Sequence, residues 1–521
     1  MSNRSTPKPA ALYDRRDLLR TAGAGSLVFG FGLGFGGART TVAQTPGASP
    51  LDELVIDLAG VPESIDPALA YSARDWSIVH SIYDSPLGFA GDGTIQPVAA
   101  ESFAAVDELT LEIVLRAGLT FHDGSPVTSA AIARSVAYMA ESGSSAAGLF
   151  AGITEVKEVD ELTARIVTDV PSPWLPAQIA VWLLLLPEGH TLDQALTAPV
   201  GSGPYRFASQ DGGSSITVIS NPDYTWGSPK GTPMAGQVVF RFVPDVSTRI
   251  ADLSTGTSHL ITEIPSSQLA AVTDGGATAV EAPVVGSAFI RIATDVAPFD
   301  DPRVRQALNH AIDVGTIGEA LVSPEARRLA SLFPDERSMA FNPDLEPYAY
   351  DPELARQLLT EAGYEDGFET ELEMTSGARV DAAEAIAAQL AEVGISVMIS
   401  VAEYTDFNAT WKDDAAPALR MATWSPLYDP QTLLSLVFAS DGFLSRYANT
   451  DVDALIESAA SEVDLDVRAS LYRELATLMY EDAPAVYLWN LTAGYGVAEW
   501  AAAWQPRGDE YVIPTIVEET A

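Results

Sequence analysis

The strongest constraint on the fold is the alternation of amphipathic helices with short apolar strands in the second half of the chain. The segments 301–312 and 351–362 each begin with Asp-Pro, a pair that caps a helix and suits its first turn. Their apolar side chains then recur every three or four residues, which is typical of a helix with one buried face. A third such pattern covers 382–393 and is followed by a strand pattern over 395–401. This alternation predicts an α/β fold.

The first half of the chain is richer in strand patterns. Runs that alternate apolar and polar residues, or short apolar runs bounded by turn residues, predict strands. Thr128 is suited to cap a helix whose apolar face contains Ile132, Val136 and Met139. The predicted strands of this half cover residues 54–58, 109–115, 163–167, 216–220 and 237–243.

Length and charge limit the number of cores and the class of partner. The chain has 521 residues, of which 47% are hydrophobic, and this is more than one core usually holds. It carries 71 acidic and 29 basic side chains, a formal charge of −42. Such a chain is repelled by phosphate backbones and anionic lipids, so no nucleic-acid partner is expected. Many acidic residues with only four lysines suit a high-salt or acid-tolerant exterior, and a GC-rich genome would equally replace lysine by arginine.

The sequence contains no recognised catalytic or metal-binding pattern. The chain has no cysteine, which excludes disulfides, thiolate metal sites and a cysteine nucleophile. Its five histidines are scattered without a metal-ligand spacing, and neither a phosphate-binding loop nor a Gly-x-Ser-x-Gly turn occurs. We therefore predict no catalytic residue, no metal site and no cofactor, and expect that the protein is not an enzyme.

Residues 1–43 have the pattern of a secretory signal. Arg15 and Arg16 precede a glycine-rich, uncharged stretch, and small residues follow at Thr41 and Ala43. The paired arginines resemble the twin-arginine type of signal, which exports folded proteins. Cleavage near Ala43 is predicted, with a retained membrane anchor as the alternative. The expected location is periplasmic or extracellular.

A series of turn and helix-start motifs runs along most of the remaining chain. Residues 121–128 read Phe-His-Asp-Gly-Ser-Pro-Val-Thr, residues 201–205 read Gly-Ser-Gly-Pro-Tyr, and residues 298–308 begin Pro-Phe-Asp-Asp-Pro. Together with further matches at 64–67, 97–102, 221–224 and 350–359, they occur in the order found in family 5 of the solute-binding proteins of ABC importers. The sequence resembles this family, whose members bind peptides, nickel complexes or oligosaccharides. Each motif is also a turn or a helix start in its own right, so none is given a binding role.

The resemblance implies a two-lobed, periplasmic-binding-protein-like α/β fold of class II, the large peptide-receptor type, with an extra subdomain in lobe I. Lobe I would cover residues 51–283, with the subdomain at 83–199, and residues 488–521 would return to it. Lobe II would cover 284–487. The hinges would lie near Pro283 to Gly286 and Val486 to Trp489, and closure around a ligand would signal to the permease.

The ligand loop expected in lobe II departs from the family pattern. The family usually has Trp-x-x-Asp-Tyr-x-Asp-Pro, whose first Asp binds a peptide's ammonium group in peptide receptors. Residues 424–430 here read Trp-Ser-Pro-Leu-Tyr-Asp-Pro, one residue shorter, with Leu427 at the ammonium-binding position. Either Asp429 takes over this role, or the ligand has no free ammonium there.

Aromatic and basic side chains near this loop are the other candidates for the site. Aromatic rings can stack on sugars, peptide planes or cations, although ordinary core packing is the competing explanation. Arg420 is one residue away from the position of an arginine that binds ligand carboxylates in some relatives. The loop 285–289 has small residues before Phe289, which suits a bulkier ligand. The predicted ligand-binding residues are Trp424, Tyr428, Asp429, Tyr404, Arg420, Phe289, Tyr487 and Trp489.

These observations predict a monomeric receptor that delivers a solute to ABC permease subunits with separate ATPase subunits. A peptide is the leading ligand class. An oligosaccharide or a metal chelate bound by the same fold is the alternative. A secreted hydrolase, an enzyme of a different class, is the least favoured hypothesis. Release of an unaltered ligand would separate the receptor from the hydrolase.

Overall fold

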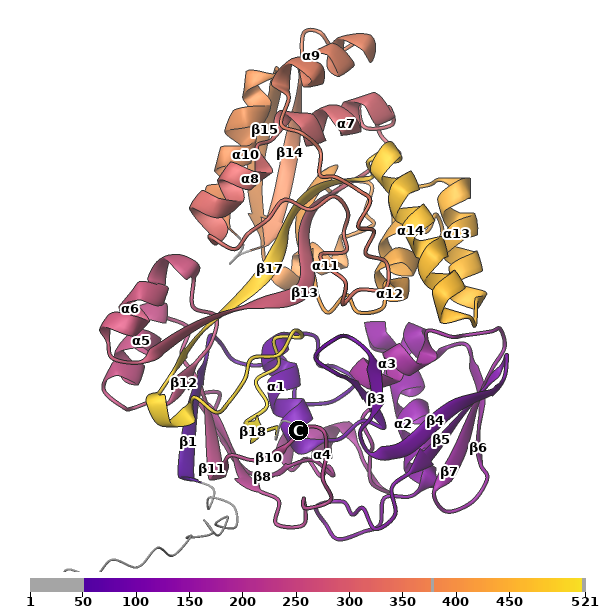
Figure 1. Ribbon diagram of the computed structural model, residues 1–521, viewed down its shortest axis with the longest axis vertical. Coiled ribbons are helices and arrows are strands. Elements are labelled where there is room, and N and C mark those ends of the chain that lie inside the picture. The colour runs from indigo at the N-terminus through magenta and orange to yellow at the C-terminus, as the bar shows by residue number, and fades with distance from the viewer. Residues whose placement is uncertain (1–50, 376–378, 518–521) are drawn as a thin grey trace, which may run out of the picture. The chain divides into compact units, whose positions relative to one another are not determined.

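The computed structural model describes residues 51–375 and 379–517, so the predicted signal at 1–43 lies outside the described residues. Its main element is a ten-stranded mixed sheet, which confirms the predicted α/β class (Figure 1). Along the sheet the strands are, in order, β15 (Ile395–Ala402), β14 (Phe368–Thr375), β16 (Leu419–Trp424), β13 (Thr278–Ile292), β17 (Ala485–Val497), β12 (Leu260–Ile261), β1 (Leu51–Leu58), β11 (Ala235–Phe242), β9 (Ser215–Ser220) and β8 (Tyr205–Asp211).

Three smaller sheets accompany the main one. A four-stranded antiparallel sheet with its own hydrophobic core lies inside the range predicted for the subdomain, and α2 (Ser129–Glu141) and α3 (Leu175–Trp182) pack against it. Its order is β4 (Ala100–Asp107), β5 (Thr110–Leu115), β7 (Thr163–Thr168) and β6 (Ile153–Glu158). The two-stranded sheets are β2 (Leu87–Phe89) with β3 (Ile95–Pro97), and β10 (Thr232–Pro233) with β18 (Thr515–Ile516).

The helices are distributed along the whole described chain. The α-helices are α1 (Ala73–Ile82), α2 (Ser129–Glu141), α3 (Leu175–Trp182), α4 (Leu192–Thr197), α5 (Val246–Ser254), α6 (Leu269–Asp274), α7 (Pro302–Ala311), α8 (Val314–Ile317), α9 (Pro352–Glu361), α10 (Val380–Glu392), α11 (Tyr404–Ala409), α12 (Gln431–Leu433), α13 (Thr450–Ser461) and α14 (Leu465–Asp482). The short 3-10 and π turns are η1 (Ser145–Phe150), η2 (Ser266–Gln268), η3 (Gly318–Val322), η4 (Leu434–Phe438) and η5 (Glu499–Ala501). None of the described helices is long and apolar enough to cross a membrane.

The helix starts predicted from Asp-Pro pairs are confirmed. The Asp301 carboxylate accepts a hydrogen bond from the Arg303 N–H at 2.8 Å, and the Asp351 carboxylate accepts one from the Leu354 N–H at 2.9 Å. Each satisfies a donor that the first helical turn leaves free. Thr128 precedes α2 as expected, but its side chain makes no capping hydrogen bond.

Two long strands, β13 and β17, join the two parts of the main sheet. They pair antiparallel from Thr278 opposite Val497 to Arg291 opposite Ala485, with irregular register between Pro283 and Phe289. At one end they belong to a core built around β1, α1 and β11, and at the other they separate two further cores. Ile290 faces the core formed with α7, α10 and β14, whereas Phe289 faces the core formed with α13 and α14. The segment 285–289, predicted as a loop, is therefore part of a strand.

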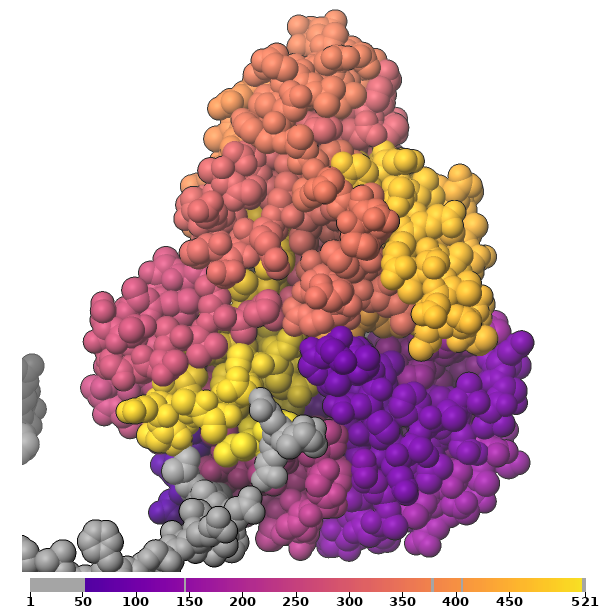
Figure 2. All heavy atoms as spheres, viewed as in Figure 1, coloured from indigo at the N-terminus to yellow at the C-terminus, as the bar shows by residue number. Residues whose placement is uncertain are grey.

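The C-terminal residues return to the part of the chain that contains β1. After β17, Trp504, Tyr511 and Ile513 join the β1 core, and β18 pairs with β10. In Figure 2 the yellow atoms of this C-terminal segment lie between pink atoms near residue 260 and indigo atoms of the first part of the described chain. The segment thereby reaches the neighbourhood of β13, where the Val285 N–H donates to the Gly508 carbonyl at 2.8 Å.

Asp57 on β1 is a buried carboxylate that we expect to destabilise the folded chain at neutral pH. It is fully buried, and its nearest cation is the Arg241 Nε at 3.3 Å. Burial outweighs this attraction and raises the pKa of Asp57 to about 6. Because the folded pKa exceeds the unfolded one, the charged form is disfavoured in the folded state. This unfavourable contribution grows as the pH rises from about 4 to about 6.

Replacing Asp57 by Asn should therefore stabilise the protein at pH 7.5 by about 1 to 2 kcal/mol, and the gain should vanish near pH 4. Urea unfolding of both proteins at the two pH values measures this difference. Asp52→Asn is the matched control, because Asp52 lies on the same strand and is exposed. A gain of the same size at both pH values would contradict the assigned cause.

Candidate functional site

The predicted ligand loop, residues 424–430, contacts the part of the chain that contains the subdomain. The Tyr428 ring stacks on the Phe89 ring of β2, with centroids 4.3 Å apart and planes 22° apart. Two residues beyond this loop, the Thr432 hydroxyl accepts a hydrogen bond from the Gln178 amide of α3. The Ser425 hydroxyl donates to the Glu510 carboxylate at 3.2 Å. The loop and the residues directly after it thus contact three segments that are distant in sequence.

The carboxylate of Asp429 already has a buried partner. Arg468 of α14 donates to it at 2.8 and 3.2 Å, and the Gln431 N–H donates at 2.9 Å. Arg468 is only 1% exposed, so this is a buried ion pair. The proposal that Asp429 binds a ligand amine stays a prediction, but its hydrogen bonds give it a structural role.

Arg420 is also held within the protein. Its guanidinium donates to Glu373 of β14 and to the Thr410 hydroxyl at 2.8 Å, and it lies over the Phe407 ring at 4.3 Å. The residue is fully buried, and it lines neither of the two cavities described below. Its contact with a ligand carboxylate stays a prediction, because Glu373 and the Thr410 hydroxyl already accept hydrogen bonds from its guanidinium.

The other predicted aromatic residues are mostly core residues. Phe289 and Tyr487 lie opposite each other on β13 and β17, and the Tyr487 hydroxyl donates to the Met479 carbonyl at 2.9 Å. Trp489 packs in the core formed with α7 and β14, and Trp424 is half-buried at the end of β16. The backbone of Tyr404 starts α11, and its side chain lies outside what the structure describes.

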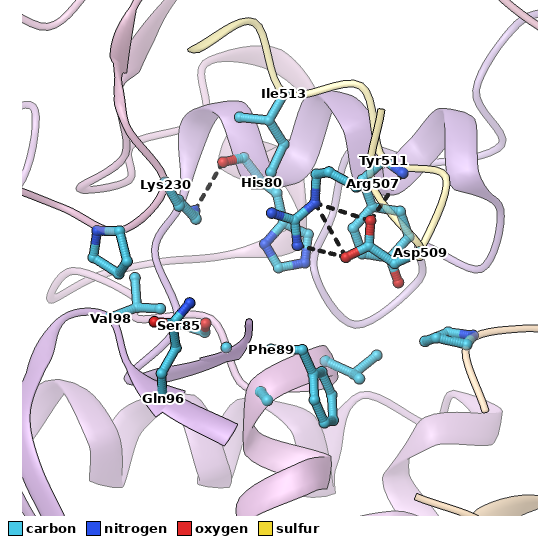
Figure 3. Close-up of a pocket in the computed structure, with 15 residues that line it drawn as sticks. His80, Ser85, Phe89, Gln96, Val98, Lys230, Arg507, Asp509, Tyr511 and Ile513 are labelled. Atoms are coloured by element: carbon cyan, nitrogen blue, oxygen red, sulfur yellow. Dashed lines mark hydrogen bonds and ion pairs between the residues drawn. The ribbon is translucent and has the colours of Figure 1, made fainter. Parts of the chain in front are cut away.

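A small cavity lies next to the predicted loop, which contributes Pro426 to its lining (Figure 3). Its volume is about 40 Å³, room for a few water molecules. The polar side chains that line it include His80, Lys230, Arg507 and Asp509. Figure 3 shows the Arg507 guanidinium bonded to the Asp509 carboxylate, with the nearest atoms of this contact 2.5 Å apart.

The charges of this small cavity are compensated within the protein. Lys230 forms an ion pair with Asp84 at 2.9 Å and donates to the carbonyls of His80 and Tyr83 at 2.9 and 2.7 Å. Burial, reinforced by Lys230, lowers the pKa of His80 well below its ordinary value, so the imidazole is neutral. The cavity is suited to ordered water or to a small part of a ligand.

A larger cavity of about 430 Å³ lies beside β17 and has mixed charge. Its size is within the range of small-molecule sites. One part of its wall comes from the start of α1, another from residues 262–265 and another from β17 at 492–495. Arg379, at the start of α10, and Glu510, in the C-terminal segment, complete the charged lining together with Arg74 and Glu263.

The charged groups of the large cavity differ in how they are paired. Arg74 lies 3.7 Å from Glu263, and Arg379 lies 3.3 Å from Asp381 outside the cavity. Within the described residues, Glu510 has no ion pair with a cation. Burial raises the pKa of Glu510 to about 7, and the negative charges of Glu263 and Asp509 raise it further. The hydrogen bond from the Ser425 hydroxyl has the opposite effect and lowers this pKa.

Two of the cavity's acids also have unusual backbones. Glu263 and Glu510 have φ angles of 52° and 66°, in the left-handed region that non-glycine residues seldom occupy. Such strained conformations persist only where the surrounding structure holds them, and they are frequent at functional sites. Both of these residues line the cavity.

Of the eight residues predicted from sequence, the seven whose side chains the structure describes line neither cavity. The loop contributes Pro426, and the charged lining comes from segments to which sequence analysis gave no role. Two signals could have drawn attention to them. Lys230 is one of only four lysines in the chain, and residues 507–511, Arg-Gly-Asp-Glu-Tyr, form a charged cluster between the largely apolar segments 500–504 and 512–517.

Comparisons with known proteins agree on the family and the fold. The family model for bacterial extracellular solute-binding proteins, family 5 Middle, matches residues 94–445. Heme-binding protein A of Haemophilus influenzae is 27% identical, covering 86% of this chain and 89% of its own. Glutathione-binding protein GsiB of Pectobacterium atrosepticum is 28% identical, covering 85% of this chain and 90% of its own.

Solved structures show the same fold at lower identity. DppA of Helicobacter pylori, in complex with the peptide STSA, has a TM-score of 0.77 and 23% identity, covering 90% of this chain and 98% of its own. NikZ of Campylobacter jejuni, in complex with Ni(L-His), has a TM-score of 0.75 and 22% identity, covering 87% of this chain and 95% of its own. These likenesses confirm the predicted two-lobed periplasmic-binding-protein fold.

Proposed function

Because the chain belongs to the bacterial extracellular solute-binding proteins of family 5, we propose that its ligand is a peptide-like zwitterion captured between two lobes. The ligand is then delivered unaltered to ABC permease subunits, without catalysis. The large cavity carries this proposal. It presents two carboxylates and two guanidinium groups in a space of about 430 Å³, and a zwitterion can compensate both signs of charge.

Closure of the two lobes explains how such a receptor signals that a ligand is bound. In the proposed division, lobe I covers 51–283 and 488–521, lobe II covers 284–487, and the hinges lie near 283–286 and 486–489. The contacts of Tyr428 with Phe89 and of Thr432 with Gln178 then join the lobes. Contacts made only in the closed form bias the equilibrium toward it once a ligand fills the cavity.

The proposed route of export follows from the signal pattern of residues 1–43. Residues 1–43 would direct export through a twin-arginine system, and the mature chain would act as a monomer outside the cytoplasm. Twin-arginine export carries folded proteins, so the receptor would fold before it crosses the membrane.

Relatives that bind other solutes define the competing ligands. A heme-binding, a glutathione-binding and a nickel-chelate-bound protein all share sequence or fold with this chain. The described residues contain no group of three or more His, Asp or Glu side chains placed to hold a metal ion. The mixed charge of the large cavity favours glutathione-like and peptide ligands, which carry both an ammonium and carboxylates.

A thermal-shift screen tests the proposal directly. Tetrapeptides, glutathione, oligosaccharides, heme and nickel–histidine are added separately, and a ligand that binds only the folded state raises the melting temperature. The rise should be measurable at 100 times Kd, where stabilisation is about 2.7 kcal/mol. Mass spectrometry of the recovered ligand should then show an unchanged mass. A shift with heme or oligosaccharide alone would contradict a peptide-like ligand, and a cleaved product would contradict a receptor without catalysis.

A further inference from the structure

We propose that Glu510, assisted by Glu263, binds the ammonium group of the ligand in the large cavity. The inference rests on the proposed function, since it assigns one end of the same ligand. It places this recognition on the C-terminal segment, and the predicted ligand loop supplies only the hydroxyl of Ser425.

The ligand loop lacks its usual acid, and the next acid of the loop is paired. Leu427 stands where the family pattern has an acid, and it is fully buried. The next acid of the loop, Asp429, is bonded to Arg468. Neither position leaves a free carboxylate for an ammonium group. A receptor for amine-bearing solutes therefore needs an acid from another segment.

Within the described residues, Glu510 is the acid of the large cavity that has no ion pair with a cation. Its only described side-chain hydrogen bond comes from the Ser425 hydroxyl at 3.2 Å, and a carboxylate can accept several more. Glu263 has Arg74 at 3.7 Å and faces the same cavity. A half-buried carboxylate without a counter-charge is unfavourable, and a ligand ammonium supplies that charge.

The contact between Ser425 and Glu510 also couples ligand binding to closure of the lobes. Ser425 follows β16, whereas Glu510 belongs to the segment that packs with the β1 core. The Ser425 hydroxyl therefore reaches across to the acid that holds the ammonium. The cavity also has two cations that a ligand carboxylate could approach, Arg74 and Arg379, which lie 3.7 Å from Glu263 and 3.3 Å from Asp381.

The test uses native mass spectrometry of the full mature chain with an equimolar library of tetrapeptides and with its N-acetylated copy. The wild-type protein should retain peptides from the free-amine library and at least about 10-fold less from the acetylated one. Glu510→Gln should lower retention of free-amine peptides at least about 10-fold, and Glu263→Gln should lower it about 3-fold. Glu108→Gln, a change on the exposed turn between β4 and β5, should leave retention unchanged.

A second readout separates ligand binding from a purely structural role. At pH 8 and without peptide, Glu510→Gln should raise the melting temperature, because it removes a carboxylate that burial disfavours in the folded state. Higher stability together with weaker binding is not expected of a structural residue. The charged and polar groups that act on Glu510 are Ser425, Glu263, Asp509 and Tyr495, and Arg74 and Arg379 line the same cavity.

The outcomes distinguish this inference from the proposed function. Equal retention by wild type and Glu510→Gln, or equal retention of free and acetylated peptides, would overturn the ammonium site while leaving a peptide receptor. If the wild type retains neither library, both proposals fail. If Glu510→Gln does not fold, Glu263→Gln becomes the deciding variant. Unchanged peptide retention by Glu263→Gln would then overturn the ammonium site.

Discussion

Replacing Asp429 by Ala should lower the free energy of unfolding by about 3 to 5 kcal/mol, the usual effect of leaving a buried charge without its partner. Arg468 would lose both hydrogen bonds to the carboxylate and keep those to the Ala459 carbonyl at 3.0 Å and the Tyr472 hydroxyl at 2.8 Å. The Gln431 N–H would lose its acceptor as well. Urea unfolding followed by circular dichroism at 222 nm measures the loss.

Two further variants show whether the unpaired arginine causes this loss. Asp429→Leu combined with Arg468→Met removes both charges and should recover a large part of the lost stability. Glu353→Ala is the matched control at the surface, because Glu353 pairs with Arg356 at 2.6 Å while 88% exposed. Its effect should stay below about 1 kcal/mol. A double variant less stable than Asp429→Ala would contradict the explanation.

Replacing Gly494 by Ala should destabilise the protein by about 1 to 3 kcal/mol and weaken ligand retention. A Cβ atom at this position would lie 2.0 Å from the Ile264 carbonyl oxygen, so the backbone itself has to move. The Ile264 N–H also donates to the Gly494 carbonyl at 2.9 Å. Both residues line the large cavity, and separating them displaces Glu263, the neighbour of Ile264.

The control for this prediction is Gly148→Ala in η1, where no atom lies within 4 Å of the added methyl group. Its stability should stay within about 0.5 kcal/mol of the wild type or rise slightly. Denaturant unfolding and the tetrapeptide retention assay provide the two measurements. Normal stability and normal retention in Gly494→Ala would show that β17 and the segment around Ile264 separate without consequence.

Sequence patterns predicted the fold better than the site. Hydrophobic periodicity and helix caps are local, so α7 and α9 begin where their Asp-Pro pairs indicated. The segment 285–289 was wrongly predicted as a loop because its small residues, such as Gly286, signal a turn. In the structure Gly286 allows close packing, since a Cβ there would lie 2.7 Å from the Ser425 Cβ atom.

The cavity lining depends on contacts between segments that lie far apart in the chain. Arg74 and Glu263 are separated by 189 positions, and no local pattern reports that they meet. Asp429 illustrates the converse difficulty. Its position in the motif suggested a ligand contact, but a buried arginine 39 residues later occupies its carboxylate. Pairing of charges across the fold decides which acids remain free for a solute.

The continuous pairing of β13 with β17 limits how this protein can be divided or rebuilt. Either half expressed alone would expose the unpaired edge of a long, largely buried strand, and such edges promote aggregation. A fluorescent reporter made from this chain should therefore keep both strands in one polypeptide. The exposed turn between β4 and β5, which forms part of a sheet with its own core, is a better place for an inserted reporter domain.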